Sequence, residues 1–234
     1  MTYEYKQFYR RKLPHIHSPN ATFFVTFRLS GAIPKAVLRE WQVKRDQLTA
    51  YLEKNGSAHE KQELRRTFNR EWFAKMEAAL DRAESGPTWL KDERVAKVVY
   101  DSILHRNDKE YHLSCFCVMS NHAHVVFRPF ITDQDLVESE ENGVPQFESK
   151  APTMPVIMQS LKGYTARKAN QILGRTGPFW DAESYDHEIR SGEEFSRIYR
   201  YVINNPVKAG IVKHWRDHPW TWVRDNDDES IRAG

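Results

Sequence analysis

Two histidines separated by a single residue are the part of this chain best suited to chemistry. His122 and His124 lie in the second half of Tyr111–Pro129, the longest apolar and β-branched run, which the polar pair Ser120-Asn121 divides. This pattern predicts two neighbouring strands of a central sheet. Because alternate residues of a strand face opposite sides, both imidazoles should share one face. They could then bind one metal ion, and a pair of hydrogen-bonded histidines without a metal is the alternative.

A tyrosine and an asparagine one helical turn apart form the second candidate. A capping-box pattern at Ser191 and Glu194 predicts a helix that begins near residue 192 and ends before Pro206. The predicted core face of this helix contains Phe195, Ile198, Tyr199 and Val202. Tyr201 lies off that face, and Asn205 follows it at the spacing that places two side chains together. A merely exposed tyrosine is the simpler alternative.

A second His-x-His pattern occurs in the basic N-terminal arm, residues 1–20. Pro14 and Pro19 flank His15 and His17, and prolines are excluded from central strands. We therefore interpret this pair as a feature of an arm or of the surface and not as a metal site.

The composition is that of an ordinary soluble globular protein. The 234 residues are 40% hydrophobic and 29% charged, and no segment is long and apolar enough to cross a bilayer. The charged, aromatic N-terminus does not resemble a secretory signal, so a cytoplasmic location is expected. Cys115 and Cys117 are two apart on one predicted strand and should be reduced core residues. A net charge of +3 permits a nucleic-acid partner without requiring one.

The remaining chain predicts alternating strands and helices in a single domain, 1–234. Strands are expected at 21–29 and toward the end of 179–190, and helices at 35–54, 58–84, 92–106 and 155–172. Residues 35–106 form a helical insertion whose charges we interpret mostly as solvated faces. The acidic segment 131–155 is expected to be a mobile loop and a poor surface for nucleic acid.

Several motifs together resemble those of the single-tyrosine HUH transposases, and most closely the REP-associated tyrosine transposases of bacteria. The resemblance rests on Val-Met-Ser-Asn-His122-Ala-His124 and on Tyr201-Val-Ile-Asn-Asn205-Pro-Val-Lys-Ala-Gly210. Supporting segments are Arg10-Arg-Lys-Leu-Pro-His15, Phe24-Val-Thr-Phe-Arg-Leu29, Leu161-Lys-Gly-Tyr-Thr165, Gly177-Pro-Phe-Trp180, Trp215 and Pro219-Trp220. Ala123 is smaller than the usual middle residue, and Ser120 stands where proline is common, but neither change removes a ligand.

The resemblance implies both a fold and an activity. The fold would be an α/β (α+β) ferredoxin-like sandwich with a central antiparallel sheet and extra helices after the first strand. His122, His124 and Asn205 would hold a divalent ion, Mg²⁺ or Mn²⁺, and Tyr201 would attack DNA to form a 5′-phosphotyrosine. The partner would be single-stranded or hairpin DNA, the protein a monomer or homodimer, and its location the bacterial cytoplasm in association with the nucleoid.

Two other functions remain open at this stage. One is a domesticated, catalytically silent protein that binds DNA hairpins, and the other is a metal phosphodiesterase that uses activated water. For DNA binding, the basic residues we select are Arg10, Arg11, Lys162, Arg167, Lys168, Arg190 and Arg197. Lys162, Arg167 and Lys168 would share one basic helix face near Tyr164, although such faces are also common without a ligand.

Overall fold

A computed structural model describes residues 3–4, 8–10, 14–16, 20–83, 85–141 and 144–224. Five antiparallel strands form its central sheet in the order β10-β5-β6-β4-β9. These strands are β4 (Thr22–Leu29), β5 (Tyr111–Val118), β6 (His122–Pro129), β9 (Trp180–Ile189) and β10 (Thr221–Val223). The order places the two strands with the richest apolar pattern, β5 and β6, beside each other as predicted.

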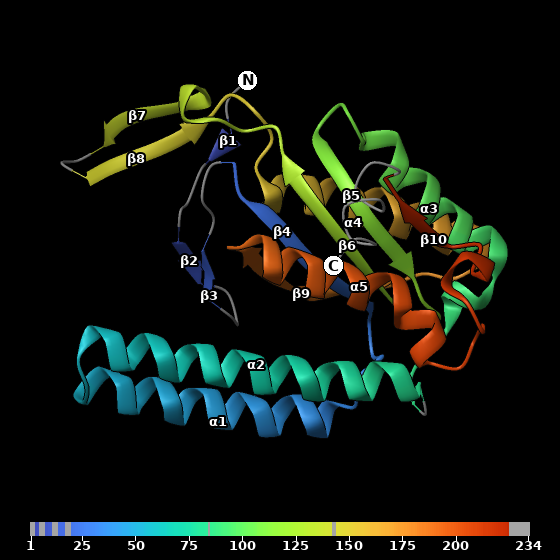
Figure 1. Cartoon of the computed structure of the whole chain (residues 1–234), viewed down its shortest axis with the longest axis horizontal. Helices are drawn as coiled ribbons and strands as arrows, with labels where there is room; N and C mark the ends of the chain where they lie inside the picture. Colours follow the sequence, from blue (N-terminus) through green and yellow to red (C-terminus); the bar gives the residue numbers. More distant parts are fainter. Residues whose placement is uncertain are drawn as a thin grey trace.

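Helices cover both faces of this sheet (Figure 1). They are α3 (Glu93–Arg106), α4 (Met154–Ile172) and α5 (Gly192–Lys208). In chain order, β4-α3-β5-β6-α4-β9 is a β-α-β-β-α-β unit with sheet order β5-β6-β4-β9. The predicted ferredoxin-like α/β fold with an antiparallel sheet is therefore confirmed by the strand order itself.

The alternation of residues along the strands explains why the two faces differ. Phe23, Val25 and Phe27 of β4 point into the larger core with α3 and α4. Phe24 points to the other face, into a smaller core beneath α5. Cys115 and Cys117 of β5 are buried there, and neither forms a disulfide, as expected.

A long helical hairpin is inserted between β4 and α3 and lies along one side of the sandwich (Figure 1). It consists of α1 (Lys35–Lys54) and α2 (Ala58–Arg82). The two helices meet through packed aromatic side chains, with the ring centroids of Trp41 and Trp72 4.9 Å apart and the ring planes tilted by 57°. A complete capping box between Ser57 and Glu60 starts α2.

The segment predicted as an acidic loop, 131–155, is instead mostly a β-hairpin. Strands β7 (Leu136–Glu141) and β8 (Val144–Ser149) pair antiparallel, and β1 (Tyr3–Glu4) adds to β8. Backbone pairing thus organises a segment whose composition alone indicated no regular structure. The prediction missed this because charged residues interrupt the usual strand pattern.

The end of α5 also differs from the prediction, because the helix continues through Pro206 to Lys208. Pro206 cannot donate a backbone hydrogen bond to Val202 and its ring crowds that carbonyl, but only two helical residues follow it, so the cost falls on the last turn. The start of α5 uses half of a capping box: Ser191 accepts from the Glu194 nitrogen, while the Glu194 carboxylate accepts from the Arg190 nitrogen.

In the N-terminal arm, β2 (Phe8–Arg10) pairs with β3 (Pro14–Ile16), which contains His15, and neither strand joins the central sheet. Arg11 and His17 lie outside the described residues. Short 3-10 helices occupy Trp89–Lys91, Asp133–Asp135 and Trp215–Asp217. Among the described helices, none combines the length and apolar character needed to cross a membrane.

Candidate metal and nucleophile site

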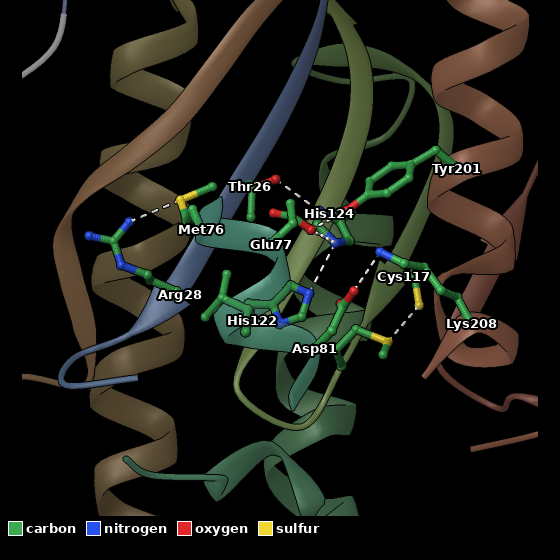
Figure 2. Close-up of polar contacts among 12 residues, drawn as sticks. Thr26, Arg28, Met76, Glu77, Asp81, Cys117, His122, His124, Tyr201 and Lys208 are labelled. Carbon is green, nitrogen blue, oxygen red and sulfur yellow. Dashed lines mark hydrogen bonds and ion pairs between the residues drawn. The ribbon is translucent and has the colours of Figure 1, made fainter. Parts of the chain in front are cut away.

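The two histidines of β6 project from the sheet face that also carries α5, with their ring nitrogens together (Figure 2). Nε2 of His122 is 3.0 Å from Nε2 of His124, and both side chains are buried. Ala123 and Val125 point to the opposite core. The predicted shared face of the two imidazoles is therefore confirmed.

Polar neighbours form hydrogen bonds with the Nδ1 atoms of both rings and so fix their orientation. Nδ1 of His122 donates to Oδ1 of Asn121 at 2.7 Å, and the Asn121 amide nitrogen donates to the Leu80 carbonyl at 3.0 Å. Nδ1 of His124 lies 2.8 Å from the Thr26 hydroxyl. Because Asn121 accepts the Nδ1 proton of His122, the Nε2 lone pair of that ring is directed into the site.

A buried carboxylate from α2 completes this group, and it is the residue that the sequence interpretation missed. Oε2 of Glu77 lies 3.3 Å from Nε2 of His124, and only 3% of the residue is exposed. The potential ligand atoms of Glu77, His122 and His124 all lie within 4.8 Å of one another. Glu77 shares its helix stripe with Phe73 and Leu80, four residues before and three after, so a carboxylate on an apolar stripe was the available signal.

Tyr201 reaches the same carboxylate from α5. Its hydroxyl donates a hydrogen bond to Oε2 of Glu77, and its ring lies edge-on to His124 with centroids 5.5 Å apart (Figure 2). Phe24 and Phe73 pack around the same ring. Tyr201, which was predicted to lie off the core face of α5, therefore lies between α5 and α2 with its ring against His124.

A second contact joins α2 to α5 one turn further along. The Lys208 ammonium pairs with Asp81 at 2.6 Å and lies 5.7 Å from the centroid of the Tyr201 ring. Asp81 follows Glu77 by four residues and therefore projects from the same side of α2. The hydrogen bond of Tyr201 and the ion pair of Lys208 thus tie the hairpin to α5.

Asn205, predicted as the third metal ligand, is buried on α5 with 1% of its surface exposed. Among the described residues, neither polar atom of its amide has a hydrogen-bond partner in good geometry. Oε1 of Glu77 is buried without a partner as well. The unpaired Glu77 oxygen belongs to the carboxylate that lies 3.3 Å from His124, so it is placed to bind a cation there.

The charge state of the group also suits a cation. Burial by itself raises the pKa of Glu77. The His124 and His122 imidazoles and the Tyr201 hydroxyl outweigh burial, and together they lower the pKa to about 2. Burial is the main reason that the pKa of His122 falls to about 3. An ionised carboxylate and a neutral imidazole are the protonation states that metal binding requires.

The phenol of Tyr201 is held in its neutral form. Burial raises its pKa above the usual value, and the Glu77 charge and hydrogen bond raise it further, whereas the Asn205 amide acts in the opposite direction. The phenol therefore needs a change in its surroundings before it can act as a nucleophile.

The basic residues selected for DNA binding are not gathered at this site. Arg167 and Lys168 are exposed on α4, which lies on the opposite face of the sheet. Lys162 donates to the Ala182 carbonyl and the Ser184 hydroxyl of β9, and it lines a cavity of about 430 Å³. The acidic residues lining that cavity are Asp181, Glu183 and Asp186. Such a lining disfavours a phosphate beside Lys162.

The other selected residues lie in two places. Arg190 and Arg197 are exposed at the start of α5, where Arg197 pairs with Glu194 at 3.4 Å. Arg10 belongs to β2, whose backbone alone is described.

Comparison with known proteins gives one structural likeness. No family model matches the chain, and no curated protein matches it significantly. The structure is similar to that of a REP-associated tyrosine transposase bound to a REP hairpin, at a TM-score of 0.47 and 14% sequence identity. The alignment covers 91% of this chain and 80% of the other. This is the protein group that the sequence motifs resemble, while the fold assignment rests on the strand order described above.

Proposed function

We propose that this protein is a metal-dependent single-stranded DNA endonuclease and transposase that nicks and rejoins DNA at hairpin-forming repeats. The observation that carries the proposal is the convergence of Tyr201, His122 and His124 on the single carboxylate of Glu77. These residues come from three separate elements, and an ordinary core has no need to bury a tyrosine hydroxyl against a carboxylate and two imidazoles.

In this mechanism the phenolic oxygen of Tyr201 attacks the scissile phosphorus. A bond forms between that oxygen and phosphorus, and the bond from phosphorus to the 3′ oxygen breaks, which leaves a 3′-OH and a 5′-phosphotyrosine. His122 and His124 would hold a divalent ion, which when bound would supply Lewis-acid stabilisation of the phosphate oxygens. The 3′-OH of a DNA end can later attack the phosphotyrosine and restore Tyr201, so rejoining needs no nucleotide cofactor.

The protein's own residues position each of these groups. Asn121 and Thr26 orient the imidazoles, and the rings of Phe24 and Phe73 hold the Tyr201 side chain against the site. Asn205, one turn after Tyr201, offers an unpaired amide to the ion or to a phosphate oxygen. Mg²⁺ and Mn²⁺ are the ions that we propose, and imidazole ligands also accept zinc.

A labelled single-stranded hairpin incubated with the protein and Mn²⁺, followed by a denaturing gel, tests this function. The expected result is a labelled band at the mass of protein plus DNA that survives denaturation. Cleaved DNA without such a band would instead indicate a phosphodiesterase that uses water, and the nucleophile assignment would be lost.

A catalytically silent hairpin-binding protein is the second candidate. It is favoured by the burial of both imidazoles, because neither is accessible to a phosphate in this structure. In the same experiment this candidate predicts retention of the hairpin on a native gel, with uncleaved DNA and no band on the denaturing gel.

A further inference from the structure

We propose that Glu77 is a metal ligand supplied by the α1–α2 hairpin, and that its coordination releases Tyr201 from the hydrogen bond that restrains it. This inference rests on the proposed function for the role of Tyr201, while the ligand assignment stands on the geometry of the site. Neither the motifs of the sequence nor the resemblance assigned any role to Glu77.

The position of the carboxylate supports direct coordination. Its ligand atoms and those of His122 and His124 lie within 4.8 Å of one another, close to the spacing of atoms that share one ion. Ligands bonded at about 2.0–2.2 Å are roughly 3–4.4 Å apart around an ion, so a small movement suffices. Oε1 of Glu77 has no hydrogen-bond partner among the described residues and is available for a bond.

The shared oxygen links metal binding to the tyrosine. Oε2 of Glu77 both accepts the Tyr201 hydrogen bond and lies 3.3 Å from the His124 nitrogen that would face the ion. A cation on this carboxylate withdraws negative charge from the oxygen that holds the phenol, which weakens the hydrogen bond. Metal binding on Glu77 therefore loosens the hydrogen bond that holds the Tyr201 hydroxyl against α2.

A purely structural role for Glu77 is the competing explanation. In that case the carboxylate only pairs with His124 and Tyr201, and Asn205 is the third ligand. The two explanations differ in what removal of the carboxylate charge does to metal affinity, because a structural hydrogen bond does not bind the ion.

Calorimetric titration of the full-length protein with Mn²⁺ separates these explanations. Glu77→Gln keeps the size of the side chain and removes its charge, and we expect its Kd to rise at least about 100-fold. Loss of a residue that merely supports a ligand already costs about 10–100-fold. Asp81→Asn is the matched control, since Asp81 lies one turn away on α2 and also contacts α5, and its Kd should stay within about threefold. His122→Ala defines binding outside the site.

A Kd for Glu77→Gln within about threefold of the unaltered protein would overturn the ligand assignment. A large loss of affinity in Asn205→Ala together with unchanged affinity in Glu77→Gln would assign the third position to Asn205 instead. Because Glu77 is buried, the folding of each variant is checked by circular dichroism.

A second measurement needs no change at Glu77. In protein carrying 3-fluorotyrosine at position 201, the fluorine resonance should shift when Mg²⁺ is added, and it should not shift when His122 is Ala. A resonance unmoved at saturating Mg²⁺ would overturn the release of Tyr201, whether or not Glu77→Gln folds. The covalent-band experiment is independent: its failure alongside a loss of affinity in Glu77→Gln would reject the proposed function but leave the ligand assignment intact.

Discussion

The hydroxyl of Tyr201 donates its hydrogen bond to the carboxylate of Glu77, 124 residues away in the chain and on a different helix. This contact brings the helix that carries the tyrosine to the inserted hairpin, directly beside the two histidines of β6. It joins the candidate nucleophile and the candidate metal ligands into one site.

Replacement of Tyr201 by Phe should eliminate both DNA nicking and the covalent protein–DNA band, because the attacking oxygen is gone. The ring contacts with Phe24 and His124 remain, so the fold and Mn²⁺ binding should persist. Tyr164→Phe is the matched control, since Tyr164 is an exposed tyrosine on α4. A phosphotyrosyl peptide that maps to residue 164 would contradict the assignment.

Replacement of His122 by Ala should abolish cleavage and leave hairpin binding largely unchanged. Under the proposed function, the imidazole acts through the metal ion on the reacting phosphate, whereas the affinity for DNA comes mainly from phosphate contacts elsewhere. Cleavage is measured on a denaturing gel and binding on a native gel with the same labelled hairpin. Equal losses in both experiments would place His122 in the DNA-binding surface and not in a metal site.

The metal-free protein should become less stable as the pH falls from about 6.5. His122 has a pKa near 3 in the folded state against 6.5 when unperturbed, so the unfolded chain takes up this proton first. Glu77, with a pKa near 2 against 4.5, stabilises the fold above pH 4.5 and loses that effect between pH 4.5 and 2.

Denaturant unfolding in a chelator at several pH values measures this dependence. His122→Ala should flatten the curve between pH 6.5 and 4.5, and Glu77→Gln should flatten it below 4.5. A curve for His122→Ala parallel to that of the unaltered protein would show that this imidazole is not buried in its neutral form.

Neutralising Arg10, Arg11, Arg167 and Lys168 together should weaken hairpin binding and reduce its dependence on salt. Each lost phosphate contact removes about 0.7 from the slope of log affinity against log salt for a single strand. Lys97→Gln is a suitable control, because Lys97 is exposed on α3 and pairs with Asp101. An unchanged slope would direct the search to Arg190 and Arg197 at the start of α5.

Much of the fold could be predicted from the sequence, because its long elements have clear periodic patterns. The helix at 35–54 and the two strands within Tyr111–Pro129 occur as predicted. The three-residue strand β10 was missed, since it is defined by pairing with β5 and too short to show a period.

The site was only partly predictable for a related reason. The shared face of His122 and His124 follows from the local geometry of a strand. The place of Glu77 follows from the packing of α2 against β6 and α5, which no local pattern encodes. Lys162 likewise has the charge expected of a DNA contact, but its ammonium donates hydrogen bonds to β9.

The origin of Glu77 and Asp81 in the α1–α2 hairpin has an evolutionary consequence. Strand β6 supplies the histidines and α5 supplies Tyr201, whereas the hairpin supplies the two carboxylates that reach α5. A descendant that lost this insertion would keep every strand and both imidazoles, yet its metal centre would lose a negative charge. Under the proposed ligand assignment, ion preference and sheet architecture are therefore specified by separate stretches of the sequence, and a change in one need not change the other.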